Sequence, residues 1–180
     1  MKKKLLNGCR ILFTISFILL IFLLTGCQTP GKGGPETAID WYNRGVFLVD
    51  KNNQEAIEAF QKSVELDPNN ADSWKAMGWC LNEIGKHSEA VSAYDQALQI
   101  NPDDPELWHR KGLVFARAGN YDEAVAAYTK ALDLYPHDPN WWLDKGDALT
   151  MLGRIAEAQE CYQEAEQQGF DKRLDKPLLE

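Results

Sequence analysis

The chain has 180 residues and carries 27 acidic against 19 basic side chains, a formal net charge of −8. Hydrophobic residues make up 44% of it, which is enough for one packed domain. An acidic surface repels phosphate backbones and anionic headgroups, so nucleic acid is not expected as a partner. The four cysteines show neither a paired metal-binding spacing nor a disulfide framework.

The first 26 residues have the pattern of a secretory signal peptide. Residues 1–10 carry four basic side chains and no acidic one, and an apolar run over residues 11–24 follows. We therefore expect residues 1–26 to be removed on export, which leaves 15 basic against 27 acidic side chains. An uncleaved signal anchor is the alternative, but about 20 apolar residues are needed to span a bilayer and this run is shorter.

The tetrapeptide at residues 24–27, Leu-Thr-Gly-Cys, resembles a lipobox. The resemblance implies that Cys27 is acylated, for example with palmitate, and becomes the first mature residue. Residues 27–37 would then be a lipidated cysteine and a tether rich in Gly and Pro, which spans roughly 15–20 Å on average. These features predict a lipid-anchored protein outside the cytoplasm, at a cell membrane or an outer membrane. In a host with two membranes, Gln28 after the cysteine favours the outer one by analogy with other lipoproteins.

From residue 38 onward the sequence repeats with a period near 34 residues. In each unit a Trp is followed four residues later by Gly, and a second amphipathic segment carries Ala and then an aromatic residue. These in-phase residues are Trp41, Trp74, Trp108 and Trp142; Gly45, Gly78, Gly112 and Gly146; Ala56, Ala90, Ala124 and Ala158; and Phe60, Tyr94, Tyr128 and Tyr162. Pro68, Pro102 and Pro136 end the first three units. This pattern resembles the tetratricopeptide repeat.

The resemblance implies an all-α fold, a right-handed solenoid of four helix-turn-helix repeats with eight helices. The repeats are predicted at residues 38–70, 71–104, 105–138 and 139–170, within a solenoid at 38–170, and a C-terminal tail follows at 171–180. The helices are predicted at residues 38–51, 54–66, 71–84, 88–100, 105–118, 122–134, 139–152 and 156–168. The Gly and Ala residues allow the paired helices to approach closely, and the aromatic residue fills the remaining space.

The first and last units depart from the pattern. The turn of the first unit, at Asn52-Asn53, is one residue short, and we expect the loop to absorb the difference. In the last unit, polar residues replace apolar ones that we predict to be in the core of the first unit. These replacements are Gln159 for Ile57, Glu166 for Val64 and Gln168 for Leu66. Residues 156–168 are therefore predicted to cap the solenoid with a polar outer face.

No set of residues indicates catalysis, a cofactor or a metal site. His87 stands where the other repeats have a packing residue, and His137 lies in a turn between repeats. Cys80 and Cys161 belong to different repeats, and repeats contact only their neighbours, so two buried thiols are expected and not a disulfide. An enzyme is therefore not predicted.

The first helices of tetratricopeptide repeats usually line a concave groove, and this resemblance supplies the candidate binding residues. Carried over by position, these are Tyr42, Val46, Val49, Asp50, Asp72, Lys75, Trp79, Asn82, Glu83, Glu106, His109, Leu113, Arg117, Leu143, Asp147 and Met151. Such a groove suits a protein or peptide segment with apolar anchors and some positive charge. Trp79 is not required by the repeat and is a candidate hot spot, with packing against the neighbouring helix as the alternative. Trp141 is expected to pack between units.

Some members of the family hold a peptide carboxylate between Lys and Asn residues of the groove. Here Lys75 matches that pattern, but Trp79 and Asn140 depart from it, so a carboxylate site of this kind is not expected. The sequence therefore predicts a membrane-tethered adaptor without cofactor, which helps to assemble an envelope or surface complex. Its architecture resembles that of the small lipoproteins that assist pilus and outer-membrane assembly. A solenoid that self-associates at the membrane surface is the alternative.

Overall fold

The computed structural model describes residues 36–49 and 51–169. The predicted signal peptide, Cys27, most of the tether, Asp50 and the tail at 171–180 lie outside the described residues. Eight α-helices account for most of the described chain. They are α2 (Ala38–Leu48), α3 (Asn53–Leu66), α4 (Ala71–Glu83), α5 (His87–Ile100), α6 (Pro105–Arg117), α7 (Tyr121–Leu134), α8 (Pro139–Met151) and α9 (Ile155–Gln167).

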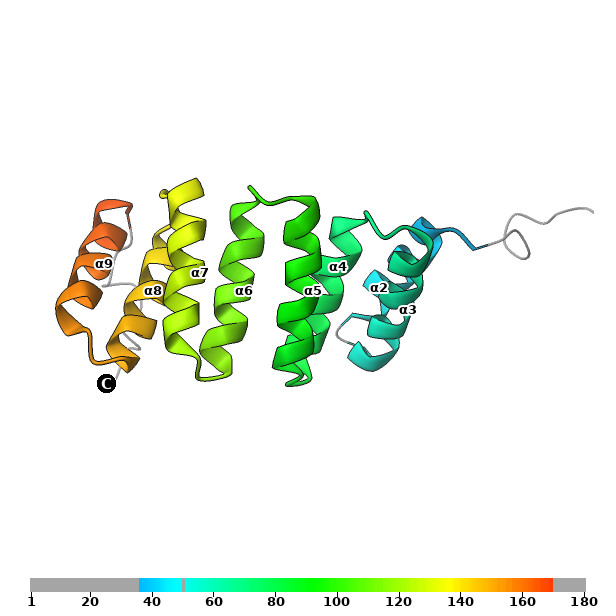
Figure 1. Ribbon diagram of the computed structural model, residues 1–180, viewed down its shortest axis with the longest axis horizontal. Coiled ribbons are helices and arrows are strands. Elements are labelled where there is room, and N and C mark those ends of the chain that lie inside the picture. Colours follow the sequence, from blue (N-terminus) through cyan, green and yellow to red (C-terminus); the bar gives the residue numbers. More distant parts are fainter. Residues whose placement is uncertain (1–35, 50, 170–180) are drawn as a thin grey trace, which may run out of the picture. The chain divides into compact units, whose positions relative to one another are not determined.

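The helices form four pairs that stack in chain order (Figure 1). Each helix packs against the next, and the first helices of neighbouring repeats also touch, α4 with α6 and α6 with α8. This arrangement is the predicted all-α solenoid of four helix-turn-helix repeats. Because the first helices approach one another across repeats, they share one continuous surface, on which the candidate groove lies.

The spacing of glycine and aromatic residues that recurs in every repeat has a direct physical reason. A Cβ atom added to Gly112 would lie 2.5 Å from Cε1 of Tyr128, and one added to Gly45 would lie 2.5 Å from Cε1 of Phe60. Real side chains do not approach so closely, so only glycine lets the two helices of a repeat come together over the ring. Tyr128 and Phe60 are almost completely buried in these contacts.

The first repeat forms its inter-helix turn differently from the others. In the later repeats, Gly85, Gly119 and Gly153 follow the first helix with φ between +75° and +80°, the left-handed region that favours glycine. The first repeat has no glycine there, and its chain leaves the helix at Val49 with ψ 139°. The prediction that the loop alone absorbs the missing residue was therefore wrong: α2 has 11 residues where the other first helices have 13.

The recurring Trp and Pro residues are joined by a hydrogen bond across each repeat boundary. The indole nitrogen of Trp74 donates to the carbonyl of Pro68 at 3.0 Å, and that of Trp108 donates to Pro102 at 2.9 Å. Trp142 and Pro136 form the same bond, at 2.9 Å. Each bond satisfies a turn carbonyl and ties a first helix to the end of the preceding repeat.

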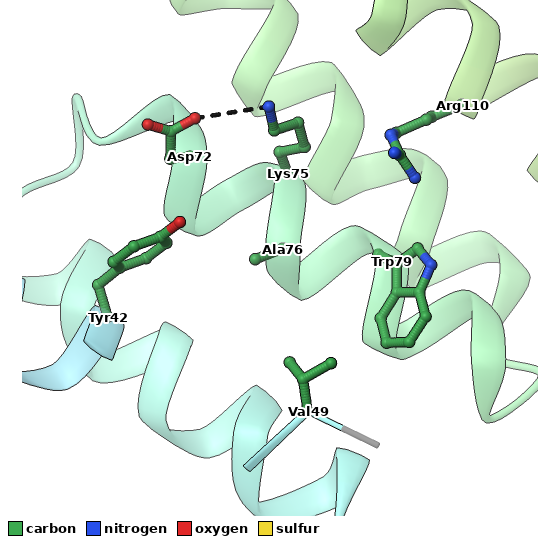
Figure 2. A pocket seen from close by; sticks show the side chains of 7 residues that line it. All are labelled: Tyr42, Val49, Asp72, Lys75, Ala76, Trp79 and Arg110. Carbon is green, nitrogen blue, oxygen red and sulfur yellow. Dashed lines mark ion pairs between the residues drawn. The ribbon is translucent and has the colours of Figure 1, made fainter. Parts of the chain in front are cut away.

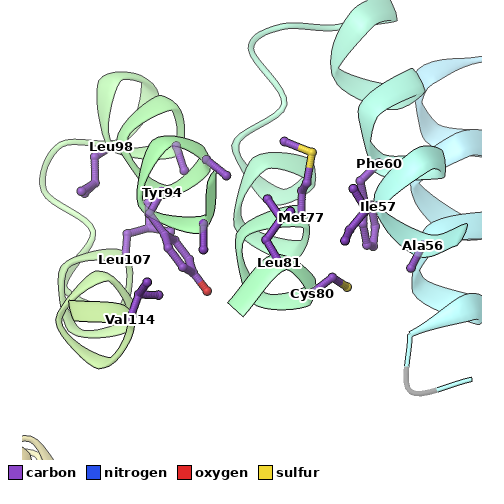
Figure 3. Packing of buried hydrophobic residues seen from close by; sticks show 13 residues of the cluster. Ala56, Ile57, Phe60, Met77, Cys80, Leu81, Tyr94, Leu98, Leu107 and Val114 are labelled. Carbon is purple, nitrogen blue, oxygen red and sulfur yellow. The ribbon is translucent and has the colours of Figure 1, made fainter. Parts of the chain in front are cut away.

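The hydrophobic core runs through the repeats along the solenoid. Figure 3 shows how Phe60 of the first repeat, Tyr94 of the second and Leu107 of the third contribute to one cluster of buried residues. Cys80 belongs to this cluster, and Cys161 belongs to a second one in the last two repeats. Both thiols are buried and lie in different clusters, as predicted.

The two outer faces of the solenoid differ. Phe47 of α2 is 68% exposed, whereas the equivalent residues Cys80, Val114 and Ala148 are only 0–2% exposed. The preceding repeat covers those three, and among the described residues no repeat precedes α2. At the other end Gln159 and Glu166 are exposed where Ile57 and Val64 are buried, as expected for a polar cap. The prediction that Leu66 is a core residue was wrong: it is the last residue of α3 and is 56% exposed.

Candidate functional site

The first helices of three repeats border a pocket of about 300 Å³. Its lining comes only from these helices and the C-cap of α2, so it lies on the surface that they share. The residues around it are Tyr42, Val49, Asp72, Lys75, Ala76, Trp79 and Arg110. Five of these seven belong to the predicted groove set, and the structure brings them together over one cavity.

Trp79 is the largest apolar side chain of the pocket. Figure 2 shows it between Val49 of the first repeat and Arg110 of the third. The side chain is half-buried and packs against the main core cluster, as do Val49 and Tyr42. Trp79 therefore both packs within the solenoid and lines the pocket.

The charged groups beside the pocket form a connected set of ion pairs. The ammonium of Lys75 lies 3.6 Å from Asp72 and 3.7 Å from Glu106, which brings the second and third repeats together. Arg110 also contacts the carboxylate of Glu106: its Nε and Nη2 lie 2.8 and 2.7 Å from Oε1. These four residues supply two positive and two negative charges, so the set is balanced.

The electrostatics of Glu106 follow from this arrangement. Partial burial raises the pKa of its carboxyl group, but the hydrogen bond and charge of Arg110, together with Lys75, outweigh burial and hold the pKa below its ordinary value. Arg110 also lies within hydrogen-bonding reach of the Tyr94 hydroxyl, and burial raises the pKa of Tyr94 to about 12. Glu106 thus holds the guanidinium of Arg110, which lines the pocket.

Further along the first helices, predicted groove residues are engaged with one another. Arg117 donates to Glu83 at 2.6 Å across one repeat boundary. Across the next repeat boundary, Nε2 of His109 lies 2.7 Å from the carboxylate of Asp144. The ring of Trp141 stacks on the imidazole of His109, with 4.9 Å between the ring centroids and 13° between their planes. The expectation that Trp141 packs between units is confirmed.

The remaining predicted residues are scattered around the pocket. Asn82 is buried and bonds to His87 at 3.1 Å, so its amide is engaged inside its own repeat and is not available in an open groove. Asp147 accepts a hydrogen bond from Tyr162 at 2.8 Å. The others do not line the pocket: Val46 and Met151 are exposed, and Leu113 and Leu143 are half-buried. Asp50 lies outside the described residues.

Sequence reasoning missed Ala76 and Arg110, which occupy the sixth position of their repeats. A signal for them was available. The sixth residue follows the second by four and precedes the ninth by three, so it lies on the same helical stripe as these two groove positions. For Arg110 the stripe joins Glu106, its ion-pair partner, to Leu113.

The described residues offer neither a metal site nor a membrane-spanning helix. Between residues 36 and 169, with residue 50 left out, no group of His, Cys, Asp and Glu side chains is arranged to hold a metal ion. Over these residues no helix is both long and apolar enough to cross a bilayer. His137 is exposed in its inter-repeat turn and lies 3.4 Å from Gln168.

Comparison with known proteins agrees with the geometry. Two tetratricopeptide repeat family models match residues 48–111 and 109–171, which together make up more than half of the chain. No curated protein sequence matches it.

Solved structures of MamA are similar in fold. One crystal structure of MamA has 24% identity and a TM-score of 0.71, over 74% of this chain and 79% of that one. A second MamA structure has 24% identity and a TM-score of 0.71, over 81% of this chain and 80% of that one. MamA from Desulfovibrio magneticus RS-1, from residue 41 to its end, has 20% identity and a TM-score of 0.70 over 79% of each chain. At such identities the likeness concerns the fold alone.

Proposed function

The chain belongs to the tetratricopeptide repeat family, and on this basis we propose that it is a scaffold without enzymatic activity that binds a segment of a partner protein in its groove. The observation that carries the proposal is the pocket of about 300 Å³ beside Trp79. A half-buried Trp at the centre of a concave, partly apolar surface is the usual setting of a binding hot spot.

The pocket suggests the chemistry of its occupant. Trp79, Val49 and Ala76 offer apolar surface to a side chain of the partner, and the ion pairs around Glu106 form a polar rim. Because the charges of the rim balance, the pocket itself selects for an apolar anchor. The acidic surplus of the mature chain would instead attract a partner with positive charge over a longer range.

We further propose that the scaffold is held at a membrane through an acylated Cys27 and acts in the assembly of an envelope or surface complex. The support is the lipobox-like end of the apolar run and the short tether after it. A solenoid confined to a membrane surface by one lipid group would collect partners there, because tethering raises their effective concentration.

The test places a photo-crosslinking amino acid at position 79 of the full-length protein in host membranes and identifies the linked peptide. The matched control has the crosslinker at Leu134, which is 41% exposed on the second helix α7. We expect one partner segment to be linked from position 79 and not from position 134. Trp79→Ala should weaken binding of that partner by about tenfold or more, as for a hot spot.

Three outcomes separate the possibilities. Loss of the partner in Trp79→Ala, with circular dichroism and melting unchanged, supports the groove. Equal capture by the wild type and the variant would contradict it. If the linked peptide belongs to a second copy of this chain, self-association at the membrane surface becomes the function.

A further inference from the structure

A second pocket, of about 450 Å³, is lined by α8 and α9, the two helices of the last repeat (Figure 1). Trp142 and Leu149 of α8 supply its apolar surface, and three glutamates of α9 stand along its wall. None of the residues that line it belongs to the predicted groove set or to the pocket beside Trp79. The α8–α9 pocket is therefore a separate feature of the molecule.

In the preceding repeat a lysine occupies the equivalent place. The ammonium of Lys111 pairs with Asp95 of α5 at 2.5 Å, across the repeat boundary. It also lies 5.4 Å from the ring centroid of Trp108 and 5.6 Å from that of Phe115. A basic side chain held between a carboxylate and aromatic rings is thus a stable occupant of this place in the repeat.

The last repeat lacks two of these contacts. Lys145 replaces the lysine, and its ammonium lies 5.6 Å from the ring centroid of Trp142. Thr129 stands in place of the aspartate and donates to a carbonyl of its own helix. Leu149, which is smaller, stands in place of the phenylalanine. The lysine therefore finds no carboxylate at this position across the repeat boundary, and space remains beside it.

The wall that α9 contributes to the pocket is acidic. Glu157, Glu160 and Glu164 are three and four residues apart and line the pocket together. The equivalent residues of α7 are Glu123, Ala126 and Lys130. Three carboxylates stand against two basic groups, Lys145 and the Arg154 that pairs with Glu157 at 2.6 Å. The pocket therefore favours an occupant that is basic beside an apolar part.

The sequence that follows α9 has this composition. Residues 172–176, Lys-Arg-Leu-Asp-Lys, place three basic side chains and one acidic one around Leu174. The leucine matches the apolar surface of Trp142 and Leu149, and the basic side chains match the acidic wall.

This segment also starts in the right place and can reach the pocket. After α9 ends at Gln167, Gly169 has a φ of +99°, in the left-handed region that commonly turns the chain at a helix end. Glu160 precedes the end of α9 by seven residues, which is about 10 Å along the helix axis. Leu174 follows Gly169 by five residues, which extend to at most about 18 Å. The chain between them is therefore long enough to run back along α9.

We propose that residues 170–176 turn back along α9 and dock into the α8–α9 pocket of the same molecule. Leu174 would lie against Trp142 and Leu149. Lys172 and Arg173 would lie beside the acidic wall and neutralise it. The segment would fill the last repeat as Lys111 fills the preceding one, and the proposal depends neither on the groove nor on the membrane anchor.

The test places the photo-crosslinking residue p-benzoylphenylalanine at position 174 of the full-length protein, and mass spectrometry identifies the linked peptide. We expect a link within one molecule to α8 or α9. Glu160→Lys combined with Glu164→Lys should lower its yield about fivefold or more, because like charges would then face each other. Glu58→Lys combined with Glu65→Lys is the matched control, since it changes the charge equally on exposed residues of α3 and should leave the yield unaltered.

An exchange of charges separates docking from damage to the fold. Lys172→Glu combined with Arg173→Glu should by itself lower the yield as well. Joined to the two lysines on α9, the same change should restore the link, because opposite charges face each other again. Circular dichroism should show the same helical content in all variants.

Three results would overturn the proposal. The first is a link from position 174 to another part of the chain, or no link at all. The second is a yield that responds equally to the changes on α9 and on α3, or that the exchange of charges does not restore. The third is a link between two molecules, visible as a dimer on a denaturing gel, which would make a second copy the occupant.

Discussion

The first and last repeats share one architecture but treat their outer faces in opposite ways. In α9 the residues that would meet a further repeat are Gln159 and Glu166, and both are exposed to solvent. In α2 the residue that would meet a preceding repeat is Phe47, which is equally open. A solenoid leaves half of an inter-repeat interface uncovered at each end, and a polar face tolerates this while an apolar one does not.

The two ends therefore differ in the polarity of the surface that they expose. The polar face of α9 can remain exposed, because Gln159 and Glu166 are polar. Phe47 of α2 instead leaves an apolar side chain exposed at a position that the other repeats bury. The same difference separates the Trp residues: Trp74, Trp108 and Trp142 donate to a proline carbonyl of the preceding repeat, whereas Trp41 is contacted by Lys62 and Arg44.

The largest loss of stability is expected from a substitution in the core of the first repeat. Phe60 is completely buried over Gly45, so Phe60→Ala should lower the free energy of unfolding by about 3–5 kcal/mol. The equivalent Tyr162 of the last repeat is half-buried, and Tyr162→Ala should cost less. Urea unfolding followed by circular dichroism measures both. A smaller loss for Phe60→Ala than for Tyr162→Ala would mean that the first repeat is a loosely attached end.

A smaller effect concerns the N-caps of the first and last helices, α2 and α9. The hydroxyl of Thr37 accepts from the backbone of Asp40 at 3.2 Å and completes a capping box, so Thr37→Ala should cost about 1 kcal/mol. Arg154, the N-cap of α9, makes no such side-chain bond, and Arg154→Ala should cost less. Chemical denaturation at neutral pH compares the two variants. Equal losses would show that the capping box does not distinguish the two ends.

The same cap predicts a pH dependence. The backbone and side chain of Thr37 donate hydrogen bonds to Asp40 and lower its pKa below the ordinary 3.8. Because the pKa is depressed in the folded state, the stabilisation is fully present above pH 3.8 and is lost as the pH falls through the lowered value. The difference between wild type and Thr37→Ala should therefore narrow only in strong acid. A difference that narrows already near neutral pH would point to another group.

The smallest effect on stability is expected from making the two ends alike. Gln159→Ile combined with Glu166→Val gives α9 the residues that α3 has at Ile57 and Val64. Exposed substitutions should change the free energy of unfolding by no more than about 0.5 kcal/mol, but the new apolar face should cause association that depends on concentration. Sedimentation measures it. Gln167→Leu, at a position that is exposed in every repeat, should not associate, and equal association of the two would mean that the polar face of α9 is not what prevents stacking.

Much of the fold could be predicted from the sequence because each repeat is a local pattern that occurs four times. The Gly112–Tyr128 contact depends on two residues of one helical hairpin, and their spacing is visible in every unit. The turn of the first repeat was harder to predict, because a repeat that is one residue short can have either a shorter loop or a shorter helix. The absence of a glycine there decided for the helix.

The candidate site was only partly predictable, because its contacts cross repeat boundaries. The pairs of Arg117 with Glu83 and His109 with Asp144 join residues 34 and 35 positions apart. A period near 34 residues indicates that such residues come close, but not which groove positions pair with each other and which remain open. Arg110 pairs with Glu106 inside α6, but it reaches a pocket whose other residues belong to the first two repeats.

By itself the sequence determined the number of repeats, the helices and their packed faces, because these follow from the period, the apolar spacing and the small residues between the helices. Only the tertiary structure decided which charges are neutralised beside Trp79, that Leu66 lies outside the core, and that Phe47 is left uncovered. These outcomes depend on how one repeat is placed against the next, and that placement results from packing between units, which no single unit encodes.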